Sequence, residues 1–191
     1  MSKNIATPND ISSPEALLRA ICAPDILPDE DADSFAYLRQ AMFQDLEPKS
    51  PYEQLLAEQM VALEWDTVRY RRLRDNLLRD EVREFAVGAL CSTRISRVKG
   101  LQVNPKFTAQ AQDLVAQDSD RRQSALRILE EKQITPSEIM AKAYQNIAKD
   151  LEVFERQIAE SETRRRKLRD DYERVRGSRP KQVEDAEVIE P

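Results

Sequence analysis

The residues best suited to chemistry in this sequence form two basic clusters. The first contains Arg69, Arg71, Arg72, Arg74 and Arg79, and the second contains Arg164, Arg165, Arg166, Lys167 and Arg169. Such side chains bind phosphates without reading bases, so the clusters indicate salt-dependent contact with nucleic acid. The possible phosphate contacts that we single out are Arg69, Arg71, Arg72, Arg74, Arg164, Arg166 and Lys167.

The same clusters also have a purely structural interpretation, as solvated faces of helices. Consecutive residues of a helix point to all sides, so neither cluster can form one flat patch. Acidic neighbours three or four residues away can pair with the basic side chains. These neighbours are Asp75, Asp80, Asp170, Asp171 and Glu173. We expect the structural interpretation to hold.

Catalytic, metal and cofactor sites are not expected. The chain has no histidine, which excludes Ser-His-Asp and Cys-His relays and His-ligated metals. The chain has three glycines, Gly88, Gly100 and Gly177, so it contains neither a GxGxxG turn nor a P-loop. Cys22 and Cys91 lie 69 residues apart, a spacing typical of neither a zinc site nor a CxxC motif. An enzyme would instead need a concave polar pocket among carboxylates, tyrosines and lysines.

Charge is distributed unevenly along the chain. Residues 1–48 hold 3 basic and 9 acidic side chains, a net of −6, whereas residues 164–181 hold 9 and 3, a net of +6. Residues 182–191 hold four acids and no base. The acidic flanks can screen the basic segment or bind it within the molecule. No membrane span or secretory signal is recognisable, so we expect a cytoplasmic protein. We also expect no small-molecule substrate.

A long helix is predicted over 51–92. Ser50 is a suitable cap, Pro51 suits the first helical position and Glu53 completes a capping box. Two apolar stripes follow side by side, one through Leu56, Met60 and Leu63 and the other through Val61, Trp65 and Val68. Two stripes predict packing against more than one partner element.

A second long helix is predicted over 136–176, after the start signal Thr135-Pro136-Ser137-Glu138. Apolar residues then recur at alternating spacings of four and three, interrupted at Ser161 and Arg165. This interaction seam contains Met140, Tyr144, Ile147, Leu151, Phe154, Ile158, Leu168 and Tyr172. A heptad seam needs another helix along it. We therefore expect the helix over 136–176 to pack antiparallel against the helix from Pro51.

The remaining segments are predicted to be shorter or irregular. We expect an irregular acidic segment over 1–33 and a helix capped by Ser34 over 34–46. A helical region over 105–132 is either one bent helix or two short ones joined near Asp118-Ser119-Asp120. A disordered acidic tail should cover 177–191. Residues 125–144 have the outline of a helix-turn-helix, although an ordinary helix connection explains them better.

Together these patterns predict an all-α protein with one helical domain over 34–176. Its core is an elongated antiparallel hairpin of two long, coiled-coil-like helices, with short accessory helices and disordered termini. Such a protein is expected to be non-catalytic and to act through its seam in self-association, as a homo-oligomer, or in docking a partner helix. The alternative is a nucleic-acid-associated accessory protein of the small packaging or mobile-element type.

Residues 26–80 resemble an uncharacterised group of small helical bacterial proteins. The resemblance is carried by Leu27-Pro28-Asp29-Glu30-Asp31, an LPxED-like segment, then by 35–46, and then by the Trp-containing amphipathic stretch 51–73. Many members begin with an NAxKHG-like element, which this chain lacks. The resemblance implies a helical fold and no particular activity.

Overall fold

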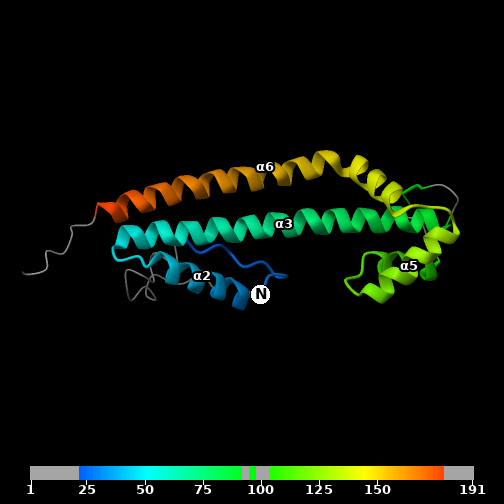
Figure 1. Ribbon diagram of the computed structural model, residues 1–191, viewed down its shortest axis with the longest axis horizontal. Coiled ribbons are helices and arrows are strands. Elements are labelled where there is room, and N and C mark those ends of the chain that lie inside the picture. Colours follow the sequence, from blue (N-terminus) through cyan, green and yellow to red (C-terminus); the bar gives the residue numbers. More distant parts are fainter. Residues whose placement is uncertain (1–21, 92–94, 98–103, 179–191) are drawn as a thin grey trace, which may run out of the picture. The chain divides into compact units, whose positions relative to one another are not determined.

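The computed structural model describes residues 22–91, 95–97 and 104–178. Within these residues the chain is all-helical, as predicted, and contains no strand. Its helices are α2 (Ala32–Leu46), α3 (Pro51–Cys91), α4 (Pro105–Leu114), α5 (Ser119–Glu131) and α6 (Pro136–Gly177), shown in Figure 1. The irregular segment expected over 1–33 and the tail expected over 177–191 lie largely outside the described residues.

Helices α3 and α6 begin with the reciprocal hydrogen bonds of capping boxes. At α3, the Ser50 hydroxyl accepts from the Glu53 amide at 3.2 Å, and the Glu53 carboxylate accepts from the Ser50 amide at 3.1 Å. At α6, the Thr135 hydroxyl accepts from the Glu138 amide at 3.3 Å, and the Glu138 carboxylate accepts from the Thr135 amide at 2.9 Å. Local sequence therefore determines both starting points.

Aspartates cap two other helices. The Asp31 carboxylate accepts from the amides of Asp33 and Ser34, so α2 begins at Ala32 rather than Ser34. The Asp118 carboxylate accepts from the amides of Asp120 and Arg121, which starts α5. The helical region over 105–132 is therefore two helices, α4 and α5.

Acid should loosen the first turn of α6. Hydrogen bonds from the amide and the hydroxyl of Thr135 lower the pKa of the Glu138 carboxyl. A lowered pKa stabilises the folded form above the ordinary glutamate pKa of about 4.3, and this contribution is lost as the pH falls through the folded value. We expect NMR amide shifts of residues 135–139 to move towards unfolded values in acid, and Glu138→Ala to move them already at neutral pH. Unchanged shifts in both experiments would contradict this role.

The chain divides into two compact units. Unit one contains the residues up to Val68 and those from Ala159 onward, and unit two contains Arg69–Ile158. The division follows from the burial pattern of α3. Its buried residues fall into one group between Glu53 and Thr67 and another between Glu81 and Leu90.

The core of unit one joins α2, α3 and the last part of α6. Its buried members include Tyr172, whose hydroxyl donates to the Leu46 carbonyl oxygen at 2.7 Å. Figure 1 shows α2 and the end of α6 along the first part of α3. The other core residues are Leu56, Ala57 and Met60. Beside them Arg39 forms an ion pair with the buried Glu58 carboxylate, with Nε 3.0 Å from both oxygens.

The LPxED-like segment also has a structural role in unit one. The Glu30 carboxylate accepts from the Leu27 amide at 3.0 Å and from the Trp65 indole N–H at 3.2 Å. Phe35 stacks edge-on against Trp65, with ring centroids 5.3 Å apart. The segment therefore attaches the chain before α2 to the face of α3.

The core of unit two joins the end of α3 to α4, α5 and the start of α6. Its buried residues include Phe85 and Leu90 of α3, Leu129 of α5 and Ile139 of α6. Gly88 lets segment 95–97 approach α3, because a Cβ atom at Gly88 would lie 1.7 Å from the Ser96 carbonyl oxygen. None of the helices in the described residues carries an apolar stretch long enough to span a bilayer.

Candidate functional site

Most of the predicted interaction seam faces the interior of the chain. Ile147, Leu151, Ile158 and Tyr172 are buried. Phe154 and Leu168 are half-buried, as is Arg165, one of the two residues that interrupt the seam. From Ile147 onward the apolar row is therefore largely covered by other residues of the same chain.

The first two residues of the predicted seam are exceptions. Met140 is 42% exposed and Tyr144 is 49% exposed, whereas Ile139 and Ala143 are fully buried. The backbone of Ile147 departs from helical geometry, with φ −114° and ψ 16°, so α6 is kinked there. Before the kink the buried face is displaced by one residue, which places Met140 and Tyr144 outside the seam.

The first basic cluster lies in unit two and is engaged in contacts with neighbours. Arg74 donates to Asp75 at 2.9 Å and to Glu155 of α6 at 2.8 Å, and these hydrogen bonds raise the pKa of its guanidinium. Arg69, Arg71 and Arg72 each have an interaction partner as well. These side chains are therefore not a set of free phosphate ligands.

The second basic cluster lies in unit one and is more accessible. Arg165 forms an ion pair with Glu64 of α3. Arg164, Arg166 and Lys167 are exposed, and so is Arg169. Among the described residues Arg169 has no ion-pair partner, and Arg166 donates only to the Glu162 carbonyl oxygen at 3.4 Å. The cluster therefore retains cationic groups that can bind an anionic ligand.

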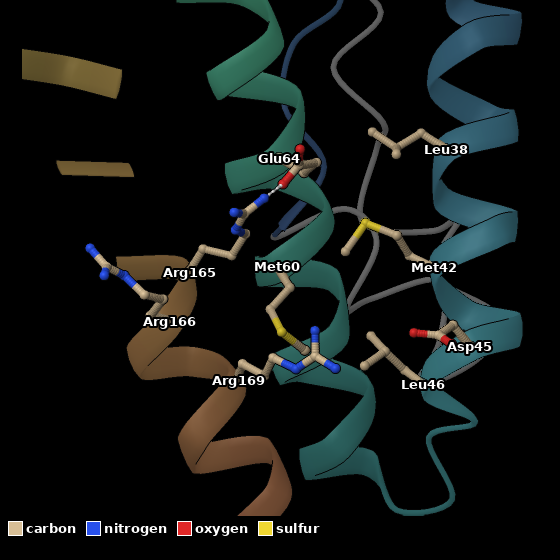
Figure 2. A pocket seen from close by; sticks show the side chains of 9 residues that line it. All are labelled: Leu38, Met42, Asp45, Leu46, Met60, Glu64, Arg165, Arg166 and Arg169. Atoms are coloured by element: carbon tan, nitrogen blue, oxygen red, sulfur yellow. Dashed lines mark hydrogen bonds and ion pairs between the residues drawn. The ribbon is translucent and has the colours of Figure 1, made fainter. Parts of the chain in front are cut away.

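A cavity of about 470 Å³ lies beside this cluster and is the candidate site. Figure 2 shows its lining, which comes from α2, α3 and α6. The lining residues are Leu38, Met42, Asp45, Leu46, Met60, Glu64, Arg165, Arg166 and Arg169. We call this space the Met–Arg cavity. Its volume is in the range of pockets that bind ligands or a few side chains.

The Met–Arg cavity combines an apolar floor with a cationic rim. Leu38, Met42 and Leu46 repeat every four residues along one face of α2, and Met60 faces them from α3. Arg169 extends from α6 towards Met60 and Leu46, whereas Arg166 points away from α3 (Figure 2). The arrangement suits a ligand that is both acidic and apolar, because methionine adapts to irregular apolar shapes and arginine binds carboxylates.

Sequence reasoning identified the basic rim of this cavity and missed its floor. Arg166 was singled out and Arg169 was recognised as a member of the cluster, but neither was connected with α2. Leu38 and Met42 lie four residues apart, so they share one face of α2. Which element it packs against depends on tertiary contacts that no local pattern encodes.

A second cavity of about 520 Å³ lies in unit one and is lined by Cys22, Gln59, Ala62, Leu63, Arg164, Lys167 and Leu168. Burial and the negative charge of Glu58 raise the pKa of the Cys22 thiol. A raised pKa keeps the thiol protonated at neutral pH, so Cys22 is not an activated nucleophile. Among the described residues no three acidic or cysteine side chains are grouped closely enough to hold a metal ion.

Comparison with protein-family models gives no match, and comparisons with curated proteins and with solved structures also give none.

Proposed function

We propose that this is a non-catalytic helical interaction protein whose long helices α3 and α6 pack antiparallel within one chain. The observation that carries the proposal is the order of contacts inside each unit. In unit one, Leu56 shares a core with Tyr172, and Glu64 further along α3 pairs with the earlier residue Arg165. As the residue numbers increase along α3, the residue numbers of their contacts on α6 decrease, as they do between antiparallel helices.

Unit two supports the same direction of packing. Arg74 pairs with Glu155 at 2.8 Å, and the Glu81 carboxylate accepts from the Asn146 amide group at 2.7 Å. Each unit alone therefore favours antiparallel helices. In this proposal the seam from Ile147 to Tyr172 is closed by the chain itself, so partners bind elsewhere.

The exposed side chains Met140 and Tyr144 are the proposed contact for a partner. They lie one turn apart on α6, so they form neighbouring apolar groups on one face. Beside Met140 is a cavity of about 400 Å³ with Leu78, Leu114 and Leu126 in its lining. Clustered exposed apolar groups are typical of protein interaction sites. We propose a second copy of the chain as the partner, which gives a homo-oligomer.

The mass measured by light scattering over a concentration series tests this proposal. We expect one chain of 22.0 kDa at the lowest concentration and a reversible rise towards two chains. Met140→Glu/Tyr144→Glu should abolish the rise, because it introduces charge into an apolar contact. Tyr37→Glu is the matched control, since Tyr37 is an exposed tyrosine of unit one. A monomer at every concentration, or an oligomer that the Met140→Glu/Tyr144→Glu variant still forms, contradicts the proposal.

Nucleic-acid binding is the second candidate function, because Arg164, Arg166 and Lys167 are exposed. Phosphate contacts of this kind release counterions, so DNA affinity should fall steeply as salt increases. A salt titration of DNA binding tests this candidate. No measurable affinity at low salt would remove it.

A further inference from the structure

The lining of the Met–Arg cavity holds three arginines and two acidic side chains, so it carries a net charge of +1. Arg166 and Arg169 have no carboxylate partner among the described residues, and Glu64 is already paired with Arg165. Asp45 is the remaining acidic side chain of the lining. The charge balance therefore favours an occupant that brings carboxylates.

The chain itself contains a segment with the complementary chemistry. Residues 182–191 carry Glu184, Asp185, Glu187 and Glu190 without any basic residue. The same ten residues include Val183, Val188 and Ile189 as well. Such a segment offers carboxylates to the rim and aliphatic side chains to the floor of Leu38, Met42, Leu46 and Met60.

The length of chain after α6 permits this contact. Helix α6 ends at Gly177, eight residues after Arg169, which is about 12 Å of helix rise. The fourteen residues 178–191 can extend over roughly 46–50 Å. A covalent tether of this length gives an effective concentration in the millimolar range. Weak surface ion pairs and a small apolar contact are then sufficient for binding.

We propose that the Met–Arg cavity binds the acidic C-terminal segment 182–191 of the same chain. The carboxylates pair with Arg166 and Arg169, and Val188 and Ile189 contact Met42 and Met60. A docked segment covers exposed cations of unit one, so it lowers the affinity of this surface for other polyanions. This inference is independent of the proposed self-association, which involves Met140 and Tyr144 in unit two.

Methionine methyl NMR of the full chain tests the contact. A spin label is attached at Ile189→Cys in a Cys22→Ser/Cys91→Ser background, and the methionine methyl groups carry ¹³C. We expect the label to broaden the signals of Met42 and Met60, with the same sample after chemical reduction of the label as the unbroadened reference. Signals of Met42 and Met60 as sharp as in the reduced sample would overturn the proposal.

Charge variants identify the cations that hold the segment. Arg166→Gln/Arg169→Gln should lower the ratio of docked to undocked segment about fivefold, as expected for the loss of two weak ion pairs. Arg174→Gln/Arg176→Gln is the matched control, because it removes the same charge from the same helix nearer to the segment. Equal broadening in the Arg166/Arg169 variant, or a larger loss in the control, overturns the proposal.

A mixing experiment separates the chain's own segment from that of another copy. Chain with ¹³C-methyl methionine and no spin label is mixed with spin-labelled chain that carries no ¹³C. We expect sharp Met42 and Met60 signals in this mixture, because the segment binds within its own chain. Broadening in the mixture would show that a second copy occupies the cavity and would overturn the intramolecular contact.

Discussion

Replacing Tyr172 by alanine is expected to lower the free energy of unfolding by about 3–5 kcal/mol, the range measured for large aromatic residues in cores. Tyr172 is 0% exposed and packs among Leu56, Ala57 and Met60, so its removal leaves a cavity where three helices meet. Urea denaturation followed by far-UV circular dichroism measures the loss. A midpoint equal to that of the wild type would show that this core does not hold unit one together.

The Tyr172→Phe variant separates packing from hydrogen bonding. It keeps the ring and removes only the donor to the Leu46 carbonyl oxygen, a bond of 2.7 Å. The expected loss is about 1 kcal/mol, a typical net value for one hydrogen bond. A phenylalanine variant as unstable as the alanine variant would mean that the hydrogen bond, rather than the ring, dominates at this position.

Replacing Gly88 by alanine is the second change with a large expected effect. The new Cβ would lie 1.7 Å from the Ser96 carbonyl oxygen and 2.8 Å from its carbonyl carbon, both of which are backbone atoms. Segment 95–97 would have to move, and the ion pair of 2.9 Å between Arg97 and the buried Glu81 would be disturbed. Overpacking of this kind costs about 1–3 kcal/mol, measurable as a lower melting temperature.

Gly177→Ala is the matched control for Gly88→Ala. A Cβ atom at Gly177 meets nothing within 4 Å. The control therefore adds the same methyl group to a glycine of a long helix without a clash, and we expect no destabilisation. Equal melting temperatures for both variants would show that Ser96 does not pack on Gly88 in solution.

The helical class and the starts of α3 and α6 could be predicted because they depend on local chemistry. The caps at Ser50 and Thr135 each make the hydrogen bonds that their sequence patterns indicate. The backbone conformation of Glu47 and Gln133 was not predictable in this way, because both residues adopt the left-handed conformation with φ of 50° and 58°. Ordinary residues thus occupy two backbone positions that usually favour glycine.

The register of the seam was predictable only from Ile147 onward. A heptad pattern assumes a regular helix, and nothing in the sequence around Ile147 marks the kink found there, since the nearest proline is Pro136. Upstream of the kink, Ile139 and Ala143 are buried, and Met140 and Tyr144 are exposed. The Met–Arg cavity could not be predicted from the sequence either, because its floor depends on how α2 packs against α3.

Distances between two spin labels test the antiparallel packing of α3 and α6 most directly. One label is placed at Leu73 of α3 and the other at either Arg156 or Lys142 of α6, in a background without native cysteines, so that both pairs lie within unit two. The proposal predicts a short distance for Leu73–Arg156 and a longer one for Leu73–Lys142, since fourteen residues correspond to about 21 Å of helix rise. The short distance should persist when labelled protein is diluted with unlabelled protein. A reversed order, or a short distance lost on dilution, would contradict a hairpin closed within one chain.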